Sequence, residues 1–131
     1  MREYKFRGKD LLEKWRYGDL VQEKWKSKLN ANEKAFMIKK DKTAHTVLAE
    51  TIGQYTGLKD KRGKEIYEGD IVVDREDGVI GQIIWNKEEA SFYFSILYDN
   101  GTYEEERLND WVSVLEVIGN IYDNKNLLEE E

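Results

Sequence analysis

Two dipeptides in the second half of the chain, Asp77-Gly78 and Asn100-Gly101, lie between segments that are rich in β-branched and aromatic residues. Asp or Asn followed by Gly tolerates the positive φ angles of a tight hairpin turn, so the flanking segments are expected to pair as antiparallel strands. The chain contains no proline, so Gly, Asn and Asp must supply its turns. These features predict a mainly β protein.

Alternation of apolar and polar residues, with β-branched and aromatic content, predicts short strands along the whole chain. Four are expected at residues 4–7, 18–23, 35–39 and 46–51, and five at residues 70–74, 78–85, 92–98, 102–107 and 116–122. Five short antiparallel strands suggest a small closed barrel, which removes exposed sheet edges. Helix is expected only in short pieces at residues 10–15, 109–114 and 124–131. No internal repeat is recognised.

The charged residues are distributed unevenly. Residues 1–63 carry a net charge of +7 and residues 64–131 a net charge of −13, within a total of −6. We therefore expect a basic β-rich subdomain at 1–63, an acidic β subdomain at 64–123 and an acidic tail at 124–131. Such a split can favour docking of the halves, head-to-tail association of chains, or an anionic partner for the basic half. Solvated charged faces are the preferred interpretation.

The sequence contains no cysteine. A disulfide, a thiolate metal site and a cysteine nucleophile are therefore excluded, which suits a reducing compartment. The N-terminus lacks an apolar run of signal-peptide length, and no segment has the roughly 18 apolar residues of a membrane span. We expect a cytoplasmic protein without membrane association.

Catalytic and cofactor motifs are weak. His45 is the only histidine, so neither a histidine cluster for zinc nor a histidine-based triad has enough members. The segment Gly57–Glu65 fails as a phosphate loop, because five residues separate its glycines and Glu65 replaces the Ser or Thr that holds magnesium. Glu104 and Glu106 would share one face of a strand as an acid pair or cation site, but a charged strand edge is the preferred interpretation. We predict a protein without enzymatic activity, cofactor or metal.

Residues 24–34 form a basic, polar segment that is expected to be a long exposed connection. If nucleic acid binds, we expect it here, because lysines neutralise phosphate and tryptophans stack on bases. The candidate contacts are Trp15, Lys24, Trp25, Lys26, Lys28 and Lys34. The aromatic residues of 92–98 lie in the acidic half, which repels phosphate. Most of them are therefore expected in the core and not on a surface that stacks on bases.

Four phrases occur in order along the chain: YKFRGKD at 4–10, KWRYGDL at 14–20, ETIGQYTGLKDKRGKEIYEGDIV at 50–72 and EVIGNIYDNKNLLEE at 116–130. Together they resemble the YopX-like family of bacteriophage and prophage proteins. The resemblance implies a phage or prophage origin, an intracellular location in a bacterial host, and a β-rich fold whose C-terminal part is similar to an SH3-like barrel. It implies no activity and no functional residue.

The fold expected overall is an N-terminal β-rich subdomain packed with a small C-terminal SH3-like barrel. The leading functional hypothesis is a phage accessory protein that binds a host or phage protein without catalysis and self-associates into a homo-oligomer. The alternative is a nucleic-acid-associated regulator that uses the basic N-terminal half. A third hypothesis is a metal-dependent hydrolase built on Glu104 and Glu106.

Overall fold

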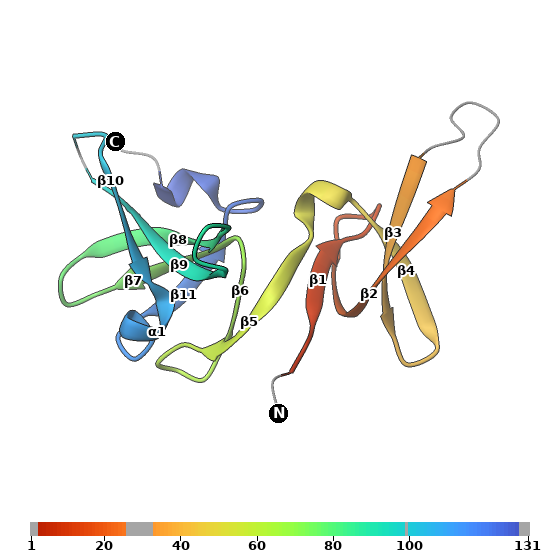
Figure 1. The fold of residues 1–131 in the computed structure, drawn as a ribbon, viewed down its shortest axis with the longest axis horizontal. Coiled ribbons are helices and arrows are strands. Elements are labelled where there is room, and N and C mark those ends of the chain that lie inside the picture. Colours follow the sequence, from red (N-terminus) through yellow and green to blue (C-terminus); the bar gives the residue numbers. More distant parts are fainter. Residues whose placement is uncertain (1–2, 26–32, 99, 129–131) are drawn as a thin grey trace. The chain divides into compact units, whose positions relative to one another are not determined.

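The computed structural model describes residues 3–25, 33–98 and 100–128, which form eleven strands and three short helices (Figure 1). A mainly β fold with only short helical pieces is therefore confirmed. The chain divides into two compact units, residues 1–55 (unit 1) and 56–131 (unit 2), which we describe separately.

Unit 1 is an antiparallel sheet. Its strands are β1 (Phe6–Lys9), β2 (Trp15–Trp25), β3 (Glu33–Lys40) and β4 (Thr43–Val47), followed by the 3-10 helix η1 (Ala49–Thr51) and the start of β5 (Gly53–Lys59). The strand order is β4-β3-β2-β1, with the first residues of β5 paired to the other edge of β1. β2 and β3 form the long hairpin of this unit, which pairs from Asp19 opposite Lys39 to Trp25 opposite Glu33.

The unit 1 sheet curls until the end of β4 meets the end of β1. The backbone N–H of Leu48 donates to the carbonyl of Lys9 at 2.8 Å, and Val47 forms a β-bridge with Asp10. Gly8 allows this approach, because a Cβ at that position would lie 3.0 Å from the Val47 side chain. Val47 is consequently buried in the core of this unit, as is Ile38.

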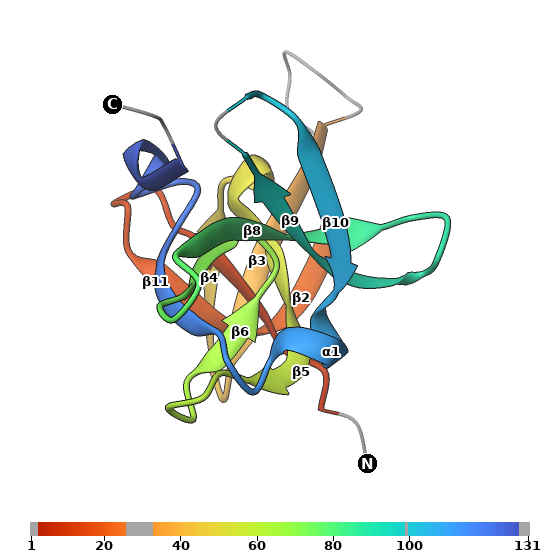
Figure 2. The same ribbon diagram turned by 90° about the vertical axis from the view of Figure 1, so that its left-hand side faces the viewer.

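Unit 2 contains the remainder of β5, β6 (Glu65–Tyr67), β7 (Asp70–Asp74), β8 (Val79–Asn86), β9 (Ser91–Leu97), β10 (Tyr103–Arg107), the helix α1 (Leu108–Trp111), β11 (Glu116–Asn120) and the 3-10 helix η2 (Lys125–Leu128). β5 neighbours β6, and the other five strands form an antiparallel sheet in the order β10-β9-β8-β7-β11 (Figure 2). Among the described residues, no pairing joins β10 to β11. The expected closed barrel is therefore corrected to an open five-stranded sheet.

The core of unit 2 lies on one face of this sheet. Phe94 at its centre packs edge-to-face on Trp111 of α1, with ring centroids 5.6 Å apart, which confirms a core role for this ring of the 92–98 segment. Gly81 lets β8 and β9 approach closely, since a Cβ there would lie 2.2 Å from the Ser95 carbonyl oxygen. The buried members of the core are Ile66, Val72, Ile83, Phe94, Ile96, Leu108 and Leu115.

Three local predictions are wrong. The helix expected at residues 10–15 is a turn followed by β2, because the Asp10 carboxylate hydrogen-bonds to the backbone of that turn and competes with helix formation. The strand expected at 46–51 ends with Val47, and the strands β5 and β6 were not predicted. The connection expected at 24–34 overlaps two strands, since β2 extends to Trp25 and β3 begins at Glu33, while residues 26–32 lie outside the described residues.

Candidate functional site

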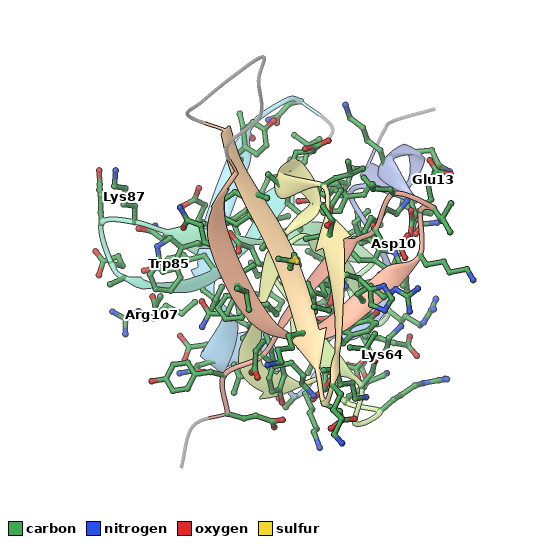
Figure 3. The ribbon with its side chains drawn as sticks, turned by 90° about the vertical axis from the view of Figure 1, so that its right-hand side faces the viewer. Asp10, Glu13, Lys64, Trp85, Lys87 and Arg107 are labelled. Carbon is green, nitrogen blue, oxygen red and sulfur yellow. The ribbon has the colours of Figure 1, made fainter. Side chains whose placement is uncertain are left out.

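The turn between β1 and β2, residues 10–14 (the Asp10 turn), is organised by one carboxylate. Oδ1 of Asp10 accepts hydrogen bonds from the backbone N–H groups of Leu12 at 2.8 Å and Lys14 at 3.0 Å. The Asp10 N–H donates to the Lys14 carbonyl at 2.9 Å, and Glu13 adopts a positive φ of 65°. Figure 3 labels both Asp10 and Glu13 in this turn.

The turn between β5 and β6, residues 60–64 (the Asp60 turn), repeats this geometry. Oδ1 of Asp60 accepts from the N–H groups of Arg62 and Lys64, both at 2.9 Å. The Asp60 N–H donates to the Lys64 carbonyl at 2.8 Å, and Gly63 has a φ of 84°. The predicted domain boundary after residue 63 falls inside this turn.

The two turns belong to an internal repeat that the sequence analysis missed. Each copy begins with Lys-Asp, at residues 9–10 and 59–60, and has a lysine four residues after the aspartate. The first copy then continues with the run YGDLV at 17–21, and the second with the run YEGDIV at 67–72. The second copy has one extra residue, Glu68, between Tyr and Gly, which shifts the alignment. Searching with this one-residue gap would have found the repeat.

The second carboxylate oxygen, Oδ2, of each aspartate accepts a hydrogen bond from a strand, and this strand differs between the two turns. Oδ2 of Asp10 accepts from Nε of Arg16 at 2.9 Å, whereas Oδ2 of Asp60 accepts from the Val117 N–H of β11 at 2.9 Å. Burial opposes ionisation of Asp60, but the N–H groups of Val117, Lys64 and Arg62 outweigh it and hold its pKa below the ordinary value. These aspartates therefore stabilise the fold.

Glu116 on β11 is also structural. Its carboxylate is buried and forms ion pairs with Arg62 of the Asp60 turn and Arg75 of the β7–β8 turn. The hydrogen bond from Arg75 and the charge of Arg62 lower the Glu116 pKa despite its burial. This ion-pair group fixes β11 and the two turns, and it presents no free carboxylate to a substrate.

The acidic strand β10 carries Glu104 and Glu106, the two glutamates considered as an acid pair. Glu104 lies opposite Ile96 and accepts a hydrogen bond from the Tyr98 hydroxyl, which raises the Tyr98 pKa. Glu106 lies opposite Phe94 on the same face, as predicted. In the described part of the chain, no group of three or more His, Cys, Asp or Glu side chains is arranged to hold a metal ion.

A surface hollow of about 590 Å³ (the unit 2 hollow) lies between the β7–β8 turn and the β9–β10 turn. Its surface is partly apolar, and Tyr98, which is 40% exposed, lies at its side. Asn100 accepts from both the N–H and the hydroxyl of Thr102, which orders the β9–β10 turn. The lining residues are Asp77, Gly78, Val79, Ile80, Ile96, Leu97, Tyr98, Asn100 and Thr102.

A second hollow, of about 480 Å³ (the unit 1 hollow), lies where β2 begins and where β3 turns into β4. Ile38 contributes an almost fully buried side chain, and His45 of β4 lies opposite it in the strand register. The lining residues are Trp15, Arg16, Tyr17, Ile38, Lys40, Asp41, Thr43 and His45. The solitary histidine thus belongs to a concave surface with basic side chains.

The family model for the YopX protein matches residues 5–129, nearly the whole chain. The chain belongs to the YopX family. A crystal structure of protein EF1440 from Enterococcus faecalis is similar to this YopX family protein at 24% identity and a TM-score of 0.45, and the match covers 98% of this chain and 100% of the other. No curated protein matches the sequence.

Among the residues predicted to contact nucleic acid in this YopX family protein, Trp15 lies far along β2 from Trp25. Trp15 and Trp25 are the first and last residues of β2, so about 33 Å of extended strand separates them. The Trp15 ring instead contacts Arg7 and Lys9, whose charged groups lie 4.8 Å and 5.6 Å from its centroid. Lys24 and Lys34 are register partners, but their side chains and that of Trp25, as well as Lys26 and Lys28, lie outside the described residues.

Within the described ranges, no helix of this YopX family protein combines the length and the apolar character that crossing a bilayer requires.

Proposed function

We propose that this YopX family protein is a non-enzymatic interaction module whose unit 2 hollow binds a protein segment that carries both cationic and apolar side chains. The observation that carries the proposal is the composition of the hollow. Val79, Ile80 and Leu97 offer apolar surface, Tyr98 offers an exposed ring, and Asp77 adds a carboxylate at the turn. Small concave sites of this volume with a few polar groups are typical of binding sites.

Electrostatics favour a cationic segment. Unit 2 contains 8 Lys and Arg against 19 Asp and Glu, a net charge of −11. An electronegative surface attracts positively charged partners and accelerates their association. Tyr98 also provides a ring face for a lysine or arginine, an arrangement that contributes about 0.5–2 kcal/mol.

The test uses a synthetic peptide in which lysines alternate with leucines, followed by fluorescence anisotropy. Asp77→Asn should weaken binding because it removes the charge, and Tyr98→Ala because it removes the ring. Tyr103→Ala is the matched control, since Tyr103 is 67% exposed on neighbouring β10 but does not line the hollow. Equal losses for Tyr98→Ala and Tyr103→Ala would reject the hollow as the binding site.

We also propose that the protein self-associates, and that it acts as a phage or prophage accessory protein in the bacterial cytoplasm. The opposite charges of the units support self-association, because unit 1 carries a net charge of +5 against −11 for unit 2. The phrases shared with the YopX family support the biological setting and a likeness of unit 2 to SH3-like domains.

The second candidate is a nucleic-acid-associated regulator. The basic charge of unit 1 and the direct pairing of Lys24 with Lys34 in the β2–β3 register favour it. This function predicts binding of single-stranded DNA or RNA that falls steeply with salt and weakens when Lys24, Lys26 and Lys28 are replaced by Gln. Lack of binding at low salt would eliminate it.

A further inference from the structure

We propose that the unit 1 hollow binds the phosphate group of a small phosphorylated ligand that also carries an aromatic or apolar part, such as a ribonucleoside monophosphate. The site is separate from the unit 2 hollow, so it extends the proposed function rather than restating it. Its lining residues come from the start of β2, the end of β3, the β3–β4 turn and β4.

Strand register places the relevant side chains on one face of the unit 1 sheet. Lys40 lies opposite Thr43, and Ile38 lies opposite His45. Residues two apart on a strand share a face, so Lys40 joins Ile38, and Thr43 joins His45. The result is an ammonium, a hydroxyl and an imidazole around an apolar floor.

Gly18 brings two of the strands that line this hollow close together. It lies in β2 two residues after Arg16, on the same face of the strand, and contributes no side chain there. A Cβ at Gly18 would lie 2.3 Å from the Lys39 carbonyl oxygen, and its φ of 156° disfavours other residues. Gly18 therefore lets β2 lie close to the end of β3, beside Lys40 of the hollow.

The donors fit a phosphate group. Nε of Arg16 donates to Asp10 Oδ2 at 2.9 Å, which fixes the guanidinium while its other four N–H donors remain. Within the described ranges, no hydrogen bond or ion pair occupies the side chains of Lys40, Thr43 or His45. Arginine, lysine and hydroxyl donors are the side chains that bind phosphate oxygens most strongly.

The other lining residues limit which ligand can bind. Asp41 also lines the hollow, and its carboxylate opposes anion binding, so its replacement should strengthen the site. Trp15 and Tyr17 also line the hollow and supply aromatic surface, and the volume accommodates more than a bare phosphate. These residues favour a phosphate that carries a base or another apolar group.

The experiment titrates the full chain with adenosine monophosphate and follows binding by calorimetry at low salt. Lys40→Met and His45→Gln should each weaken binding roughly tenfold, the effect of losing one charge-assisted hydrogen bond. Lys42→Met is the matched control, because Lys42 is an exposed cation of the same turn that does not line the hollow. Asp41→Asn should tighten binding, and asparagine tolerates the positive φ of 56° at that position.

Adenosine should fail to bind, and a short oligonucleotide with a terminal phosphate distinguishes a nucleic-acid source from a free nucleotide. Binding of either phosphorylated ligand through Lys40 supports the site. Absence of binding by both, or an equal loss for Lys42→Met and Lys40→Met, would overturn it. Thermal melting of each variant verifies that the fold is retained. Failure of the lysine–leucine peptide to bind would leave these results unaffected, because that peptide concerns unit 2.

Discussion

A single carboxylate organises each of the two repeated turns, and its two oxygens have different tasks. One oxygen of Asp60 orders the turn by accepting from Arg62 and Lys64, while the other accepts from Val117 on β11. The turn thereby links a local conformation to a strand far away in the sequence. The same residue type at Asp10 links its turn to Arg16 on β2.

Replacing Asp60 by asparagine should destabilise unit 2. An asparagine can keep the two bonds of Oδ1, but its amide nitrogen would then face the Val117 N–H, so that two donors meet. Urea unfolding should show a lower midpoint for Asp60→Asn than for the exposed control Glu88→Gln. Equal midpoints would mean that the bond to Val117 contributes nothing to stability.

Asp60 also predicts a dependence of stability on pH. Its pKa is lower in the folded chain than the value of about 3.9 expected after unfolding. Its stabilising contribution is therefore present above that unfolded value and is lost as the pH falls through the lower, folded pKa. Urea midpoints measured from pH 6 down to pH 2 should fall less steeply in Asp60→Asn than in the original protein.

Gly81 is required for close packing of β8 on β9. Gly81→Ala would place a methyl group 2.5 Å from Cε2 of Phe94 and closer still to the Ser95 carbonyl. The expected cost is about 1–3 kcal/mol of unfolding free energy, typical of overpacking. Gly101→Asn is the control, because that turn position is open and asparagine tolerates its φ of 83°. A cost no larger than that of Gly101→Asn would contradict the packing described for these strands.

At the scale of elements, the sequence predicted the strands whose signals are local. Residues 70–74 were predicted with the bounds of β7, and the turns at Gly78 and Gly101 have the positive φ expected of them. β5 and β6 were missed because Gly53, Gly57 and Gly63 interrupt the alternating pattern. Their pairing depends on the Asp60 turn and on contacts with distant residues.

The candidate sites were less predictable than the fold. Both hollows combine residues from three or more elements, and a single sequence does not say which strand ends meet. The surroundings of His45 could not be predicted from the sequence, because its neighbours in the hollow include residues of β2 and β3. Only the strand register, which places it opposite Ile38, brings these residues together.

β10 is an edge strand with three consecutive glutamates, and we interpret these charges as protection against strand-to-strand association. Replacing Glu104, Glu105 and Glu106 by glutamine should increase aggregation, because an edge without charges can pair with another chain. Light scattering during incubation at 37 °C measures the effect, with glutamine at the turn residues Glu88 and Glu89 as the control. Unchanged scattering would leave the acid-pair interpretation of Glu104 and Glu106 the better one.

At the scale of the whole molecule, the central feature is the contrast in charge between the units, +5 against −11. Contacts between exposed charges on separate chains weaken when salt screens them, over about 10 Å at 0.1 M ionic strength. The mass in solution, measured by light scattering coupled to size exclusion, should therefore fall from an oligomer at low salt toward the monomer at high salt. A monomeric mass at low salt would reject self-association.

The most direct test of the proposed function is a nuclear magnetic resonance titration of the labelled full chain with the lysine–leucine peptide. Binding in the unit 2 hollow predicts that the amide signals of Gly78, Val79, Tyr98 and Thr102 shift together and saturate, while those of the unit 1 hollow stay in place. Shifts confined to other surfaces, or no shifts at millimolar peptide, would contradict the account.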